Sequence, residues 1–162
     1  MKLEKGLNIY NITYKMSDLK PSNLKPLEKK EKKEKTQKKE KFTEVACGVM
    51  YNKEGRILMG LRPPGNLYPG VWEFPGGSRE SNETIEDCLR REWKEELNLN
   101  IQIEKEIYST TFGKYYCRFF VGVIIDEENV IQHIHKKITF VFPCEISALR
   151  LFEGDEKILQ YL

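Results

Sequence analysis

Residues 84–97 constrain the fold most, because their apolar side chains recur at the spacing of an α-helix. Ser81, Asn82 or Thr84 is expected to cap the start of this helix. At about 100° per residue, one face holds five apolar side chains: Ile85, Cys88, Leu89, Trp93 and Leu97. Glu92 and Glu96 fall inside this apolar stripe, which a simple amphipathic helix would not contain.

Glu92, Glu95 and Glu96 are neighbours on this helix, since they are spaced i, i+3 and i+4. Like charges that are clustered and partly buried repel one another, which raises the pKa of the carboxyl groups. Clustered oxygen ligands suit Mg²⁺ or Mn²⁺, which share their coordination sphere with waters and phosphates. From the residues alone, ion pairing of Glu92 and Glu96 with lysine or arginine from elsewhere remains an equal alternative.

The segments around this helix are short apolar runs separated by turn residues, which is typical of strands. A four-residue connection, residues 52–55, predicts a hairpin between the first two runs. The fold class expected is α+β, with a mixed, mainly antiparallel sheet and two helices. The predicted strands are 45–51, 56–61, 71–74, 101–109, 115–125 and 138–142, and the second predicted helix is 154–162.

The charge distribution divides the chain into two parts. Residues 1–41 hold 13 lysines and 6 acidic residues, whereas residues 42–162 hold 14 basic and 19 acidic residues. Residues 20–41 have too little apolar surface to offset the entropy of folding, so residues 1–41 are predicted to be a disordered extension and residues 42–162 a folded domain. Weak contact of this lysine-rich tail with RNA or an anionic surface is one interpretation, and a solubilising leader is the other.

The sequence also predicts the cellular setting. Its longest dense apolar run, residues 119–125, is far shorter than the roughly 20 residues of a membrane-spanning helix. The N-terminus lacks the apolar core of a secretory signal, so we expect an intracellular, cytoplasmic protein, with a nuclear location left open by the lysine-rich tail. Because the four cysteines are scattered, we expect reduced core thiols instead of disulfides or a zinc site.

The residues before and within the helix form a spaced motif. From Gly77, five residues lead to Glu83 and seven more to the run Arg91-Glu92-Trp93-Lys94-Glu95-Glu96-Leu97-Asn98-Leu99. This string resembles the Nudix box, G-x5-E-x7-R-E-U-x-E-E-x-G-U, where U is a bulky apolar residue. Asn98 replaces the last glycine, and asparagine also tolerates the left-handed conformation of a helix C-cap.

The resemblance implies a Nudix-type α/β/α sandwich and hydrolysis of a pyrophosphate bond in a nucleotide substrate, with Mg²⁺ or Mn²⁺ as cofactor. It implies that Glu92, Glu95 and Glu96 are catalytic metal ligands and that the Gly77 carbonyl is a further ligand. Glu83 and Arg91 match the pair that ties the loop to the helix. The general base is a box glutamate or a downstream group, for which this chain offers Glu127, Glu128, His133 and His135, each of which is otherwise a polar loop residue.

The run Trp72-Glu73-Phe74-Pro75-Gly76-Gly77 is similar to the MutT-like branch, which implies a nucleoside triphosphate cut to monophosphate and pyrophosphate. Candidate substrate-binding residues are Arg62, Phe74, Tyr116 and Asp155, and each also has an ordinary structural interpretation. The segment 151–155 differs from the MutT segment that recognises oxidised guanine. Dinucleoside-polyphosphate hydrolysis, mRNA decapping and a non-catalytic nucleotide-binding module remain alternatives.

Overall fold

The computed structural model describes residues 42–162, so the predictions for residues 1–41 lie outside the described residues. A seven-stranded sheet forms its centre, with the strand order β3-β2-β1-β6-β5, and with β4 paired to β1 and β7 paired to β2. The strands are β1 (Thr43–Tyr51), β2 (Ile57–Leu61), β3 (Trp72–Glu73), β4 (Gly76–Ser78), β5 (Ile101–Phe112), β6 (Tyr115–Ile124) and β7 (Lys137–Val141).

The predicted hairpin joins β1 to β2. The Asn52 N–H donates to the Arg56 carbonyl at 2.8 Å, and Gly55 adopts φ +75°, which glycine does without a steric penalty. Strands β1 and β6 run parallel, whereas every other pairing in the sheet is antiparallel. The expected mixed, mainly antiparallel sheet is therefore confirmed.

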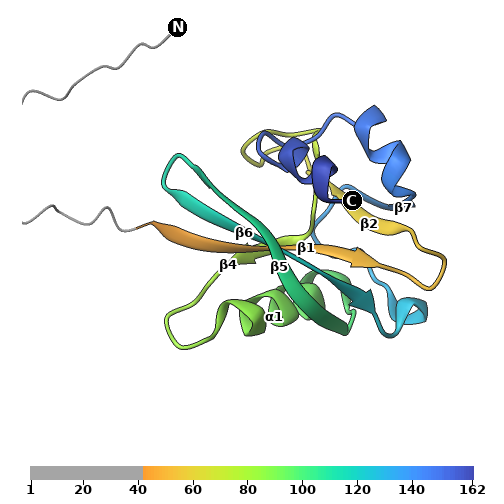
Figure 1. Ribbon diagram of the computed structural model, residues 1–162, viewed down its shortest axis with the longest axis horizontal. Helices are drawn as coiled ribbons and strands as arrows, with labels where there is room; N and C mark the ends of the chain where they lie inside the picture. Colours follow the sequence, from red (N-terminus) through yellow and green to blue (C-terminus); the bar gives the residue numbers. More distant parts are fainter. Residues whose placement is uncertain (1–41) are drawn as a thin grey trace, which may run out of the picture. The chain divides into compact units, whose positions relative to one another are not determined.

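Both faces of the sheet are buried. Successive side chains of β1 point to opposite faces, and each set packs against a different layer. Ala46 and Met50 pack against helix α1 (Ile85–Leu97), whose apolar stripe includes the fully buried Trp93. On the other face, Cys47 and Val49 pack against two 3₁₀ helices, η2 (Pro143–Ala148) and η3 (Asp155–Tyr161). Figure 1 shows α1 on one side of the sheet and these C-terminal turns on the other, which is the expected sandwich.

Both ends of α1 have the expected caps. Thr84 is the N-cap, and its side-chain oxygen accepts a hydrogen bond from the Asp87 N–H at 3.1 Å. Asn98 is the C-cap in the left-handed conformation, with φ 56° and ψ 27°. The asparagine that replaces the glycine of the box therefore keeps the same backbone turn.

The helix predicted over residues 154–162 is present as the 3₁₀ helix η3, whereas the short strand β4 was not predicted. Strand β5 continues to Phe112, and the turn η1 (Glu127–Asn129) and the helix η2 were not predicted. The expectation of core thiols is wrong for Cys144, which is exposed, although all four cysteines are free. Within residues 42–162, no helix is long and apolar enough to cross a membrane.

Candidate active site

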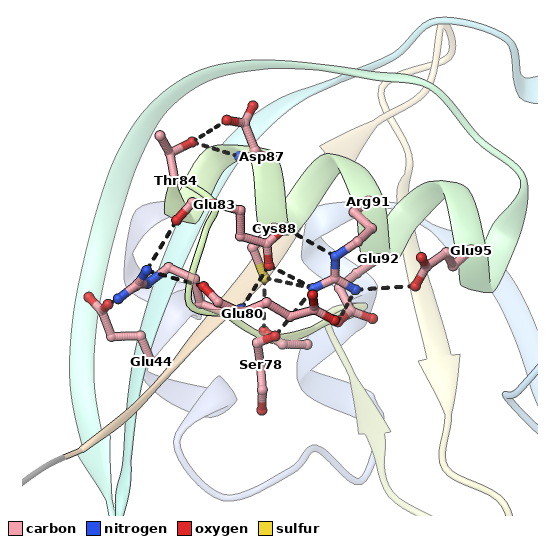
Figure 2. Close-up of polar contacts among 12 residues, drawn as sticks. Glu44, Ser78, Glu80, Glu83, Thr84, Asp87, Cys88, Arg91, Glu92 and Glu95 are labelled. Atoms are coloured by element: carbon pink, nitrogen blue, oxygen red, sulfur yellow. Dashed lines mark hydrogen bonds and ion pairs between the residues drawn. The ribbon is translucent and has the colours of Figure 1, made fainter.

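Arg91 is the centre of the polar network on α1. Its guanidinium donates two hydrogen bonds to the Glu83 carboxylate, from Nη2 at 2.8 Å and from Nε at 3.1 Å. The Glu80 N–H donates to the same carboxylate, so the loop before α1 is held to the helix. These hydrogen bonds lower the pKa of Glu83 to about 2 and raise that of Arg91. The structure thus brings Glu83 and Arg91 together as the box resemblance implies (Figure 2).

Glu92 and Glu95 extend from the same helix to the other side of Arg91, whose Nη1 donates to both carboxylates, at 2.9 and 3.2 Å. The Glu92 side chain is 15% exposed, whereas that of Glu95 is 61% exposed. Gly77 lies directly against the Glu92 carboxylate, and a Cβ at Gly77 would be 2.3 Å from it. A side chain at position 77 would therefore displace the Glu92 carboxylate from its present place.

Glu92 and Glu96 have carboxyl groups that are short of positive charge. Burial is the main reason that the pKa of Glu92 is raised, although Arg91 acts in the opposite direction. The pKa of Glu96 rises to about 8, first through burial and then through repulsion by Glu92, Glu73 and Glu95. A bound cation would relieve this excess of negative charge.

The donor set suits a hard divalent cation, because every predicted ligand is an oxygen and two carboxylates lack a full counter-charge. Within residues 42–162, however, no three His, Cys, Asp or Glu side chains lie close enough together to hold a metal. Glu95 is directed to Arg91, and the Gly77 carbonyl accepts the Cys88 thiol hydrogen at 3.5 Å. In this geometry Glu95 faces Arg91, and its side chain would have to rotate for all three carboxylates to share one cation.

A cavity of about 230 Å³ brings three of the four predicted substrate-binding residues together: Arg62, Phe74 and Asp155. The buried Asp155 carboxylate accepts a hydrogen bond from the Phe74 N–H at 3.0 Å, and burial raises the pKa of Asp155. Two backbone hydrogen bonds to Trp72 bring the C-terminal segment to the cavity. The Trp72 N–H donates to the Arg150 carbonyl, and the Phe152 N–H donates to the Trp72 carbonyl.

Tyr116, the fourth predicted substrate-binding residue, is not among the residues that line this cavity. Its hydroxyl is 3.1 Å from the Ser109 Oγ, and Tyr115 lines the cavity instead. Adjacent residues of a strand point to opposite faces, so the two tyrosines are separated by the sheet. The two tyrosines are adjacent in the sequence, and only their places in β6 distinguish them.

Glu73 is a site residue that the sequence analysis missed. It lines the cavity, its Oε2 accepts from Arg62 Nη1 at 2.5 Å, and its Oε1 lies 3.5 Å from His135 Nε2. Its charge also contributes to the raised pKa of Glu96. Glu73 therefore connects the cavity to the box carboxylates. In the sequence, the only indication of this role is that Glu73 is an acidic residue between two aromatic ones, Trp72 and Phe74.

The candidate bases downstream of the box differ in their surroundings. The His135 side chain is 2% exposed and its ring packs on Gly60, where a Cβ would be 2.3 Å away. His133 is exposed, and its backbone N–H donates to the Glu96 carbonyl at 3.1 Å. Glu127 accepts a hydrogen bond from the Asn52 side chain, and Glu128 is exposed. His135 alone among these four contacts a cavity residue in the described part of the chain.

The NUDIX domain family model matches residues 41–160. The chain belongs to the NUDIX family. An 8-oxo-dGTP diphosphatase from Proteus vulgaris is 39% identical over 62 residues, covering 38% of this chain and 55% of that protein. A CTP pyrophosphohydrolase from Escherichia coli is 33% identical over 129 residues, covering 74% and 90%. An RNA pyrophosphohydrolase from Hydrogenovibrio crunogenus is 41% identical over 112 residues, covering 57% and 66%.

The chain spans about half the length of the first curated relatives that it matches. Among solved structures, the E. coli ORF135 protein superposes with a TM-score of 0.62 at 25% identity, covering 74% of this chain and 87% of that one. A MutT structure from a study of Aliivibrio salmonicida and Vibrio cholerae superposes with a TM-score of 0.60 at 21% identity, covering 75% and 96%. The predicted MutT-like Nudix fold is therefore confirmed.

Proposed function

We propose that this protein is a metal-dependent hydrolase that cuts a (deoxy)nucleoside triphosphate to the monophosphate and pyrophosphate. The observation that carries the proposal is the connection between the cavity and the box. Gly77 lines the cavity and also lies against the Glu92 carboxylate, so a base in the cavity would have its phosphates close to the box carboxylates. The names of the relatives, an 8-oxo-dGTP diphosphatase and a CTP pyrophosphohydrolase, support this substrate class.

Glu92, Glu95, Glu96 and the Gly77 carbonyl are the proposed ligands of Mg²⁺ or Mn²⁺. When bound, the cation would neutralise phosphate oxygens and lower the pKa of a water. The protein's own part is to hold these oxygens in place. Arg91 is held by Glu83, so it fixes the first turns of α1 and presents Glu92 beside Gly77. Glu83 and Arg91 thus act as positioning residues.

The cavity residues have separate proposed tasks. Arg62, already paired with Glu73, has a guanidinium that can bind a phosphate oxygen at the edge of the cavity. The Phe74 ring forms an apolar wall for the base. One carboxyl oxygen of Asp155 accepts the Phe74 N–H, and its other oxygen can bind the edge of the base. Placing the base and the phosphates together orients the reacting bond.

A box glutamate is the proposed general base. His135 is too enclosed to reach an attacking water, because its side chain is 2% exposed and is packed on Gly60. Glu127 is engaged by Asn52, and the described contacts of His133 run through its backbone. Of the box carboxylates, Glu95 is the most exposed, so solvent reaches it most easily.

A second candidate is removal of pyrophosphate or a cap from the end of an RNA. The similarity to an RNA pyrophosphohydrolase and the 13 lysines of residues 1–41 favour it. Phosphate contacts by lysines would make such activity fall steeply with salt concentration. Free triphosphates would show little of this dependence.

The test is a substrate panel with Mg²⁺ and then Mn²⁺, in which released pyrophosphate and phosphate are measured separately. The panel holds normal and oxidised nucleoside triphosphates, diadenosine tetraphosphate, ADP-ribose and capped and triphosphorylated RNA. Pyrophosphate from a free triphosphate supports the proposal. Turnover of RNA alone supports the second candidate, and binding without turnover of any substrate would favour a nucleotide-binding module.

A further inference from the structure

Three aromatic rings that line the cavity also contact one another: Tyr68, Phe112 and Phe152. The ring centroids of Tyr68 lie 5.9 Å from Phe112 and 5.4 Å from Phe152, and the latter two are 5.4 Å apart. All three pairs are edge-on, and all three residues line the cavity. They come from a loop, from the end of β5 and from the C-terminal segment, so one wall is assembled from three separate elements.

Tyr68 has an unfavourable backbone conformation. Its φ is +58°, in the left-handed region where Cβ crowds the backbone of an L-residue. Gly65 and Gly70, in the same loop, also have positive φ, but glycine adopts such values freely. Glycine at position 68 would remove this strain, so the tyrosine stands there against the local backbone preference.

Tyr68 is 45% exposed, so the rings of Phe112 and Phe152 cover it only in part. The loop around it is nevertheless fixed in place. Arg62 Nε donates to the Leu67 carbonyl at 2.9 Å, and the Gly70 N–H donates to the Arg62 carbonyl at 3.1 Å. The Arg62 guanidinium also lies 5.4 Å from the Phe152 ring centroid. The loop therefore holds the partly exposed Tyr68 ring in a fixed position at the cavity.

We infer that Tyr68 is a base-contacting residue of this cavity, and that its strained backbone is kept because it places the ring against a planar heterocycle. The inference rests on the proposed function only for the identity of the ligand as a nucleotide. A purine offers a larger face than a pyrimidine, so Tyr68 contributes more to purine binding. Loss of base–aromatic stacking is expected to weaken binding by about tenfold.

The test compares Tyr68→Gly, which removes both the ring and the strain, with Tyr68→Phe, which keeps the ring. Binding of GMP, CMP and ribose 5-phosphate is measured by calorimetry without metal, so that the result does not depend on turnover. Tyr68→Gly is expected to weaken GMP binding about tenfold, CMP binding less, and ribose 5-phosphate binding not at all. Tyr68→Phe is expected to bind GMP like the unmodified protein, because it keeps the ring and its contacts with Phe112 and Phe152.

Tyr161→Ala is the matched control, because Tyr161 is 47% exposed but does not line this cavity. The inference is overturned if Tyr68→Gly binds GMP like the unmodified protein, if it loses ribose 5-phosphate equally, or if neither nucleotide binds at all. Tyr68-dependent GMP binding in a protein without pyrophosphohydrolase activity would contradict the proposed function and leave this inference standing. In an active enzyme, the loss falls mainly on KM and less on kcat.

Discussion

Two carboxyl groups of the same Nudix box, Glu83 and Glu96, have opposite electrostatic surroundings. Glu83 accepts hydrogen bonds from Nη2 and Nε of Arg91, which lower its pKa to about 2, whereas burial and carboxylate neighbours raise the pKa of Glu96 to about 8. A carboxylate with its counter-charge already in the protein stabilises the fold. A buried carboxylate that lacks one weakens the fold, and a cation would supply the missing charge. Under the proposed function, Glu83 is therefore a structural acid and Glu96 a metal ligand.

The largest expected effect is on turnover. Glu96→Gln removes a charge and keeps the size of the side chain, so kcat/KM is expected to fall about a hundredfold or more with the best substrate of the panel. Glu104→Gln, at an exposed position of β5, is the matched control and should change little. Unchanged turnover in both Glu96→Gln and Glu95→Gln would refute the metal assignment.

The second effect sharpens the contrast, because Glu83→Gln should act on stability as well as on activity. Loss of the carboxylate leaves Arg91 facing Glu92 and Glu95 alone and releases the loop before α1. We expect a lower Tm and about a tenfold loss of activity, the size typical of a supporting residue. Thermal unfolding of Glu83→Gln is compared with Glu80→Gln, which changes an exposed neighbour. Equal Tm values would show that the Glu83–Arg91 pair is not structural.

The third effect is the pH dependence of stability without metal. The pKa of Glu96 is higher in the folded than in the unfolded protein, so the folded state binds more protons between about pH 4.5 and 8. The contribution of Glu96 therefore declines as pH rises through this window. Glu83 shows the reverse, since its lowered pKa stabilises the fold above its unfolded pKa and that contribution is lost as pH falls toward about 2.

Glu96→Gln should therefore be more stable than the unmodified protein at pH 8.5, by on the order of 1–3 kcal/mol. The two should converge near pH 4.5. Denaturant unfolding at several pH values in the presence of EDTA measures this difference. A variant that is less stable than the unmodified protein at pH 8.5 would contradict the interpretation of Glu96 as an uncompensated charge.

A smaller and more selective effect is expected at Asp155. Asp155→Asn keeps an oxygen for the Phe74 N–H and removes a buried charge, so stability should be maintained, while the ratio of kcat/KM between bases shifts by about tenfold. Asp155→Ala leaves the Phe74 N–H without its partner and should cost about 1–3 kcal/mol of stability. An unchanged base preference in Asp155→Asn would remove Asp155 from the substrate site.

The smallest effect on free nucleotides is expected from deleting residues 1–41. The proposed catalytic groups all lie in residues 77–96, so turnover of a triphosphate should barely change. RNA cleavage, if present, should become weaker and less sensitive to salt because up to 13 lysines are lost. Rates at two salt concentrations for both substrates measure this, and a large loss with the free triphosphate would tie the tail to the active site.

The sequence predicted what depends on local spacing. The helical period of residues 84–97, the Thr84 cap and the box spacing placed α1 and brought Glu83 to Arg91. It could not predict what depends on distant contacts. Glu73 acquires its role only when Arg62 and His135 converge on it, and Tyr115 differs from Tyr116 only through the register of β6. The same holds for Asp155, which reaches Phe74 through the pairing of the C-terminal segment with Trp72.

The most direct test of the central claim is a calorimetric titration of the purified protein with Mn²⁺ at pH 7, in buffers of different ionisation enthalpy. Because the pKa of Glu96 is raised to about 8, a proton must leave when the cation binds. We predict proton release on binding that is lost in Glu96→Gln, together with much of the affinity. Mn²⁺ binding without proton release, or equal binding by Glu96→Gln, would contradict the account.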